Sequence, residues 1–355
     1  MASATTGATL TPQTAVPAAA STRRGGAAPH LLAALRPLGR LLLTTATVLF
    51  LASVITFALG AFSKSNPAAT VLGETATEQD IATMNHQFGL DRPLVPRYFT
   101  WLGDALHGDL GKSWFTTVPV SDSIKQALPV DLSIALLALV LAILLGTGAG
   151  VAAALRAGGF VDRAVTVVCS VVATLPPFVI GIALIVLLAV KARLLPAGGY
   201  VALDVDPVQW LRFSILPALA LSIEVAANIA RQLRTSLVGA LRENYAIGAE
   251  MRGFSRRRVL FGHVLRNAIS PTLAVIGMAI PLIIGGAVMT EKLFNLPGIA
   301  QLALQSAQRG DVPVVLGTLL VTAVIVLIGS LVVNALQLML NPAARRAGTL
   351  TGGAR

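Results

Sequence analysis

The sequence YAIGAEMRGFSRRRVLFGHVLRN, residues 245–267, carries the most specific structural pattern in this chain. Two short helices can be drawn in it, separated by Gly253, which suits the left-handed conformation that often ends a helix. Ser255 is a favourable N-cap for the second helix. On that helix the arginines gather on one side and the apolar side chains on the other, namely Val259, Leu260, Val264 and Leu265. We therefore predict a helix–glycine–helix unit whose second helix is amphipathic.

The chain around this unit is strongly apolar. Of its 355 residues, 55% are hydrophobic and 12% are charged, and the mean hydropathy is +0.78. Soluble domains contain about 25% charged residues, so an ordinary soluble protein is excluded. The net charge of +11 then indicates basic cytoplasmic loops rather than nucleic-acid binding. Cys169 is the only cysteine, so we expect neither an intramolecular disulfide nor a metal site.

Six apolar runs are long enough to cross a bilayer, which takes about 20 residues of helix. They are residues 41–62, 132–155, 164–190, 213–230, 268–290 and 312–340. The fourth run is the weakest because Glu224 interrupts it. The sequence therefore predicts an all-α membrane protein with six transmembrane helices.

The loops between these runs alternate in charge. Eight arginines follow the fourth run, whereas residues 63–131 hold five basic and eight acidic residues. Basic loops remain in the cytoplasm, so we predict that both termini and residues 245–267 are cytoplasmic. Residues 1–30 and 343–355 are then cytoplasmic tails, the first expected to be disordered because it is rich in Ala, Thr, Pro and Gly. Residues 31–62 hold the first transmembrane helix, 63–131 form an extracytoplasmic helical segment, and 132–342 form the core domain with a cytoplasmic loop at 241–267.

Two local signals stand out in the extracytoplasmic segment. Thr77, with Asp80 three residues later and Gly89 as a stop, predicts a short capped helix. GDLGKS, residues 108–113, has the end of a phosphate-binding loop, but Leu106 stands where that motif requires glycine. No catalytic set clusters in the sequence, so we expect no catalytic residue and no enzyme activity in this chain. Any ATP that its work requires would be bound by another chain.

Polar and helix-breaking residues inside the runs are candidates for a translocation path. An acid such as Glu224 in a membrane span usually faces a polar cavity or a partner, and Asn228 and Arg231 follow on the same helical stripe. Glu224 either lines a cavity or forms a structural link to a neighbouring helix or to Arg231. Pro176 and Pro177 predict a kink, which serves either a pathway or packing. Three small residues of the second run allow close helix packing: Gly146, Gly148 and Gly150.

Residues 245–267 resemble the cytoplasmic "EAA" loop of permease subunits of ATP-binding-cassette importers. Ala249 and Gly253 match its alanine and glycine, whereas Met251 stands where another alanine is usual. The outer segment LGETATEQDIATMNHQFGLDRPLVPRYFTWLGDALHGDLGKS is similar to the first permease of the dipeptide, oligopeptide and nickel branch. LPPFVIGIALIVLLAV, LLPAGGY, LRNAISPTLAVIG and TEKLFNLPGIAQLALQSAQRGDVPVV are similar to that branch as well. SKSNPA after the first run departs from the Pro-Gly-Asp-Pro turn common there.

The resemblance implies a type I importer permease in the cytoplasmic (inner) membrane of a bacterium. Its implied partners are a second homologous permease, two ATPases that bind ATP and Mg, an extracytoplasmic substrate-binding protein and a peptide. This chain itself would bind no cofactor. The residues implied to couple to the ATPases are Tyr245, Ala249, Glu250, Gly253, Ser255 and Arg256.

Other functions remain open from the residues alone. An ion-gradient-driven transporter would use Glu224 for coupling and no ATPase, and a membrane-embedded enzyme would need a catalytic cluster. Dipeptides, oligopeptides, glutathione and chelated nickel all remain as substrates.

Overall fold

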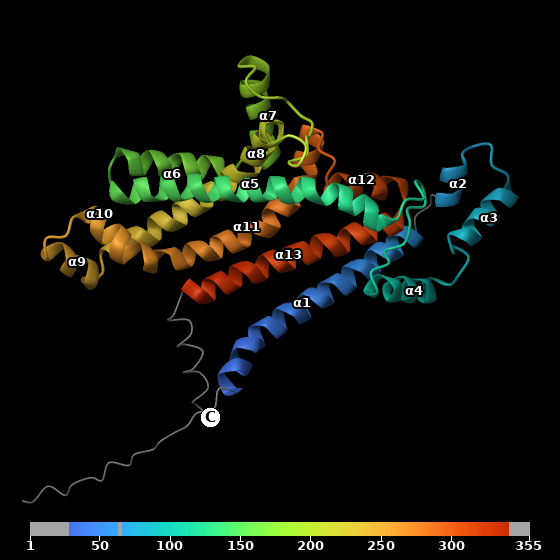
Figure 1. The fold of residues 1–355 in the computed structure, drawn as a ribbon, viewed down its shortest axis with the longest axis horizontal. Helices are drawn as coiled ribbons and strands as arrows, with labels where there is room; N and C mark the ends of the chain where they lie inside the picture. The colour runs from blue at the N-terminus through green and yellow to red at the C-terminus, as the bar shows by residue number, and fades with distance from the viewer. Residues whose placement is uncertain (1–27, 63–65, 341–355) are drawn as a thin grey trace, which may run out of the picture. The chain divides into compact units, whose positions relative to one another are not determined.

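The computed structural model describes residues 28–62 and 66–340 (Figure 1). The predicted tails, residues 1–30 and 343–355, lie outside the described residues apart from 28–30. The chain divides into two units, residues 1–41 and 42–355. The described part of the first unit is only the beginning of helix α1 (Ala28–Ala61), and every other described element belongs to the second unit. No strand occurs in the described ranges of this second unit.

Five helical stretches are long and apolar enough to cross a membrane. They are residues 42–61 of α1, α5 (Val120–Leu155), α8 (Pro207–Leu241), residues 268–294 of α11 (Leu265–Phe294) and residues 312–333 of α13 (Val312–Leu340). A bent pair makes a sixth span if it is counted as one: α6 (Phe160–Val172), then α7 (Pro177–Leu184) with its π-helical continuation η1 (Ile185–Lys191). The prediction of an all-α protein with six spans is confirmed when the bent pair is counted as one span.

The predicted kink at Pro176 and Pro177 is a full break. The helices on its two sides meet at 106°. Pro177 begins α7, where its missing amide hydrogen leaves no helical bond unmade. The residue before a proline disfavours the helical conformation, and Pro176 accordingly has an extended ψ of 146°. The third predicted run therefore changes direction in its middle.

The segment after α1 forms three short helices, α2 (Pro67–Leu72), α3 (Glu78–Gln87) and α4 (Leu94–Leu106). The predicted cap of α3 is confirmed, because Thr77 Oγ1 accepts a hydrogen bond from Asp80 N at 3.2 Å and Asp80 Oδ2 accepts one from Thr77 N at 3.1 Å. The predicted stop at Gly89 has a left-handed φ of 68°. Tyr98 of α4 is buried against α1, and its hydroxyl shares a hydrogen bond of 2.8 Å with Ser53 Oγ. This contact joins the outer helices to the first span.

Helix α8 is the most buried of the spans and packs mainly against α5 and α11. Two of the three predicted packing glycines make this contact possible. A Cβ on Gly146 would lie 2.7 Å from the carbonyl oxygen of Ala226, and one on Gly150 would lie 2.9 Å from that of Ala230. Gly148 faces open space instead.

Two further groups of short helices lie at opposite ends of this unit (Figure 1). At one end, α9 (Asn244–Met251), α10 (Arg256–Val259) and the π-helical segment η2 (Leu260–Val264) connect α8 to α11. At the other end, α12 (Ile299–Arg309) connects α11 to α13 and lies near the beginning of α5. The first end is the one predicted to be cytoplasmic.

Candidate functional site

An open groove of about 650 Å³ lies between α8 and α11. The α8 wall is mostly polar and the α11 wall is apolar. The polar residues are Asn228, Arg231, Gln232 and Thr235, and the apolar ones include Val275, Met278 and Leu282. This polar stripe belongs to the most buried of the spans and includes two of its exposed residues, Arg231 and Thr235. A polar stripe inside a membrane protein is suited to contact a hydrophilic solute.

The candidate path residues occupy different places. Asn228 lines the groove, and its Oδ1 accepts a hydrogen bond from Arg231 Nη2 at 2.6 Å. Glu224 lies one turn earlier on α8, is half-buried and does not line the groove. Within the described residues its carboxylate makes no ion pair, so the link between Glu224 and Arg231 is not formed. Pro176 and Pro177 lie at the break between α6 and α7 and do not line the groove either.

The helix–glycine–helix prediction is confirmed as local structure. Helix α9 ends at Met251, Gly253 follows with a left-handed φ of 84°, and α10 begins at Arg256. Ser255 Oγ accepts a hydrogen bond from Arg258 N at 3.4 Å, a long but correctly placed cap. The Arg258 guanidinium stacks over the Phe254 ring, 4.7 Å from its centroid. These contacts fix the turn between the two helices.

The two faces of this unit differ in apolar exposure. Its inner face is buried in a cluster that joins α8, α9, α10 and η2. The cluster includes Leu233, Leu237, Ala246, Ala249, Val259, Leu260 and Val264. Met251, 85% exposed, and Tyr245, 41% exposed, lie on the outer face with Glu250. Ala249, one of the residues implied to couple to the ATPases, is thus enclosed by its own chain. The side chain of Arg256 lies outside the described residues.

The sequence prediction missed one contact near the groove. Arg234 of α8 forms a double hydrogen bond with Asp162 of α6. The Asp162 side chain is nearly fully buried. In the sequence, Arg234 is one of many loop charges, and Asp162 carries no signal of its own. The two residues are 72 positions apart, so no local pattern connects them.

Residues 142–346 match the family described as binding-protein-dependent transport system inner membrane component. Residues 34–135 match the N-terminal model of the same kind of membrane component. The chain belongs to this family and is a multi-pass protein of the bacterial inner membrane.

Three relatives place the chain within the family more narrowly. It is 36% identical over 306 residues to the probable peptide ABC transporter permease protein y4tP of Sinorhizobium fredii, covering 86% of this chain and 98% of that protein. It is 32% identical over 297 residues to the glutathione transport system permease protein GsiC of Escherichia coli, covering 84% and 94%. It is 30% identical over 293 residues to the oligopeptide transport system permease protein AppB of Bacillus subtilis, covering 82% and 93%. The chain is therefore a permease of the peptide branch of ATP-binding-cassette importers.

Proposed function

We propose that this chain is one permease subunit of an ATP-driven importer that moves di- or oligopeptides by alternating access. One observation carries the proposal: both walls of the groove end at the same short helical unit. Helix α8 forms one wall and leads into α9, and η2 leads into α11, which forms the other wall. A force on α9 and α10 therefore acts on both walls of the groove.

The contact surface for the ATPases is the outer face of this unit. Amphipathic helices commonly dock in a groove of a partner protein. Tyr245, Glu250 and Met251 are exposed there at the end of the molecule predicted to be cytoplasmic. Exposed apolar side chains outside the membrane spans favour a protein partner. Gly253 and Ser255 set the angle between α9 and α10, and Arg256 begins the second helix.

The buried inner face transmits the movement. Ala246 and Ala249 of α9 are packed against Leu233 and Leu237 of α8 with almost no exposure. Because such packing resists compression, α9 moves together with the end of α8 rather than on its own. Ala249 thus acts as a link between the ATPase and the groove, not as a docking contact.

The groove is the half of the path that this chain supplies. Its polar stripe around Asn228 and Arg231 would contact peptide amide and carboxylate groups, and a second homologous permease would close the opposite side. ATP and Mg would be bound by the two ATPases, and an extracytoplasmic binding protein would deliver the substrate. Rocking of two bundles about a central site is a recognised form of alternating access.

The substrate class rests on the relatives, whose names refer to peptides, oligopeptides and glutathione. Glutathione is itself a tripeptide, so a path with polar groups that contact peptides would suit the substrates named for all three relatives. The alternative of ion-gradient coupling through Glu224 has no supporting contact, since this carboxylate does not line the groove.

Uptake into membrane vesicles tests the proposal. The chain is produced with its partner subunits, and uptake of a labelled dipeptide, a labelled tetrapeptide and labelled glutathione is compared with ATP or with an ion gradient alone. We expect ATP-dependent uptake of at least one of these substrates and co-purification of an ATPase with this chain. Uptake that needs a gradient but neither ATP nor an ATPase would overturn the proposal.

A further inference from the structure

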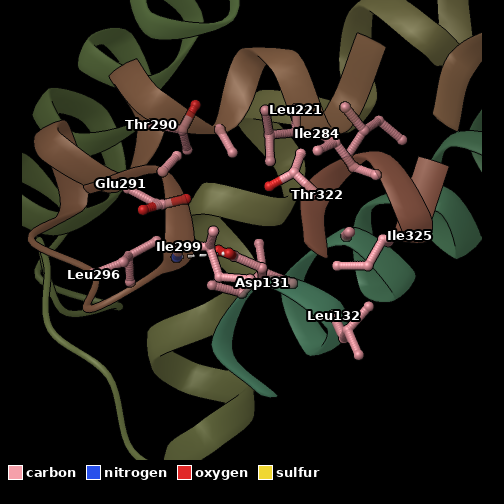
Figure 2. A pocket seen from close by; sticks show the side chains of 15 residues that line it. Asp131, Leu132, Leu221, Ile284, Thr290, Glu291, Leu296, Ile299, Thr322 and Ile325 are labelled. Atoms are coloured by element: carbon pink, nitrogen blue, oxygen red, sulfur yellow. Dashed lines mark hydrogen bonds between the residues drawn. The ribbon is translucent and has the colours of Figure 1, made fainter. Parts of the chain in front are cut away.

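Two carboxyl groups from different helices meet at the start of α12 (Figure 2). Asp131 Oδ2 of α5 accepts a hydrogen bond from Ile299 N at 2.7 Å, and Glu291 Oε2 of α11 accepts one from Gln301 N at 2.7 Å. The first amides of a helix have no carbonyl partner within the helix, so acceptors from outside stabilise them. Helix α12 is therefore capped by two acids that lie far apart in the sequence.

The two groups are crowded against each other. A Cβ on Gly298, the residue before α12, would overlap both Asp131 Oδ1 and the Glu291 carboxyl group. Both acids therefore converge on one point beside the chain, on the same side of Gly298. Only glycine leaves room for them at position 298.

One oxygen of this pair has no partner. Glu291 is 2% exposed, and its Oε1 is buried without a hydrogen bond. Both acids line an adjoining cavity of about 70 Å³, whose walls are otherwise mostly apolar. Thr290 and Thr322 are its other polar side chains. Burying a hydrogen-bond acceptor without a donor is costly, so we expect this oxygen to have a donor hydrogen.

No basic side chain in the described part of the chain compensates the pair. Neither acid forms an ion pair, and Lys292 beside Glu291 is exposed. Of the neighbouring elements, α12 contributes Gln301, α13 contributes Thr322 and α8 contributes Leu221, none of which titrates. Tyr200 is another titratable residue, and its hydroxyl is paired with Ser133 Oγ of α5 at 3.2 Å. Two adjacent carboxylates in a low-dielectric site without a cation do not both ionise.

We propose that Asp131 and Glu291 form a proton-binding site that holds one proton between their carboxyl groups. The shared proton supplies the donor that the crowded oxygens lack. It also leaves the pair with a single negative charge, which the positive end of the α12 dipole favours. A hard metal cation is a poorer occupant, because such ions take six or more oxygen ligands and two oxygens of the pair are already bonded.

The packing of α12 against α5 and α11 therefore depends on whether this proton is bound. When the proton leaves, the two negative charges repel each other around Gly298, and this repulsion weakens the hydrogen bonds that cap α12. The proton therefore stabilises the folded state, and this stabilisation is lost as the pH rises.

Infrared spectroscopy of the purified full-length protein in lipid tests the site without any partner subunit or transport. We expect the carbonyl band of a protonated carboxylic acid at neutral pH. D131N should lose band intensity equal to one group, because the asparagine amide supplies Glu291 with the donor that the proton otherwise provides. The matched control D122N alters an exposed acid of the same helix and keeps the band. An equal band in D131N and in the unmodified protein would overturn the proposal.

Thermal unfolding gives a second readout. From about pH 6 to about pH 9, a range above the ordinary values of free carboxyl groups, the unfolding midpoint of the unmodified protein should fall more than that of D131N. Asparagine cannot ionise, so the variant should lose this part of the pH dependence. Parallel pH profiles for the two proteins would contradict the shared proton.

Discussion

Arg234 and Asp162 form a two-point ion pair that joins α8 to the start of α6. Arg234 Nε donates to Asp162 Oδ1 at 2.8 Å, and Arg234 Nη2 donates to Asp162 Oδ2 at 2.7 Å. The same Oδ2 accepts a hydrogen bond from Gly158 N at 2.8 Å. Since Thr235, the next residue on α8, lines the groove, this pair fixes the loop between α5 and α6 to the groove wall.

Replacing Arg234 with lysine tests the geometry of this pair. Lysine keeps the charge but cannot form the paired fork of hydrogen bonds. We expect R234K to lower the thermal unfolding midpoint by about 1–2 °C, the shift that a loss of about 1 kcal/mol causes in a chain of 355 residues. R231K changes an exposed arginine one turn away and serves as the control for stability. Equal midpoints for R234K and the unmodified protein would show that charge alone suffices.

The contact between α5 and α8 depends on glycine at two positions. In G146A the added Cβ would lie 2.7 Å from the Ala226 carbonyl oxygen and 2.7 Å from Ile229 Cβ. Overpacking of this kind costs about 1–3 kcal/mol, so G146A should unfold at a lower temperature. G148A, on the same helix with nothing within 4 Å, should be unchanged or more stable. The idea of close packing fails if both variants behave alike.

Asn228 and Glu224 test where the path lies on α8. N228A removes a groove residue that accepts a hydrogen bond from Arg231, so we expect several-fold slower peptide uptake at unchanged expression. E224Q removes a charge that does not line this groove, and its effect on uptake should be smaller. Uptake is measured at several pH values, because a coupling role of Glu224 would appear as a changed pH profile. A stronger loss in E224Q than in N228A would place the path elsewhere.

Asp311 gives a prediction on pH. Burial raises the pKa of this carboxyl group, although Ser113 Oγ and Trp114 N donate hydrogen bonds to it. The folded protein thus holds the proton more tightly than the unfolded chain, so protonation favours folding. The stability of the unmodified protein relative to D311N should be greatest below about pH 4 and should decrease as the pH rises through the raised pKa. A difference that grows with rising pH would mean that the pKa is lowered instead.

The spans could be predicted from the sequence because each depends on a continuous apolar run. The two prolines at 176 and 177 indicate a kink, but its angle of 106° depends on packing that no local pattern encodes. Helix α5 begins at Val120, well before the predicted run at 132. Its first turns are less apolar, and they are held by contacts with Leu110 of the preceding loop, α12 and α13.

The local form of the helix–glycine–helix unit was also predictable, since Gly253 and Ser255 are strong signals for a helix end and a helix start. The position of Ala249 was not, because its burial depends on Leu233 and Leu237 of α8. The pair formed by Asp131 and Glu291 was missed for the same reason. In the sequence Asp131 is one acid of the outer segment and Glu291 one of a short loop, and only the fold brings them together.

The central claim is that α9 and α10 transmit ATPase movement to the groove, and Gly253 tests it most directly. In G253V the added Cβ would have no heavy atom within 4 Å, and the left-handed φ of 84° costs about 1–2 kcal/mol for a residue with a Cβ. The matched control is G248A within α9, which also meets no neighbour and has an ordinary helical backbone. We predict that G253V loses peptide-stimulated ATP hydrolysis in the assembled transporter and that G248A retains it. Full stimulation in G253V, at equal subunit content, would contradict the account.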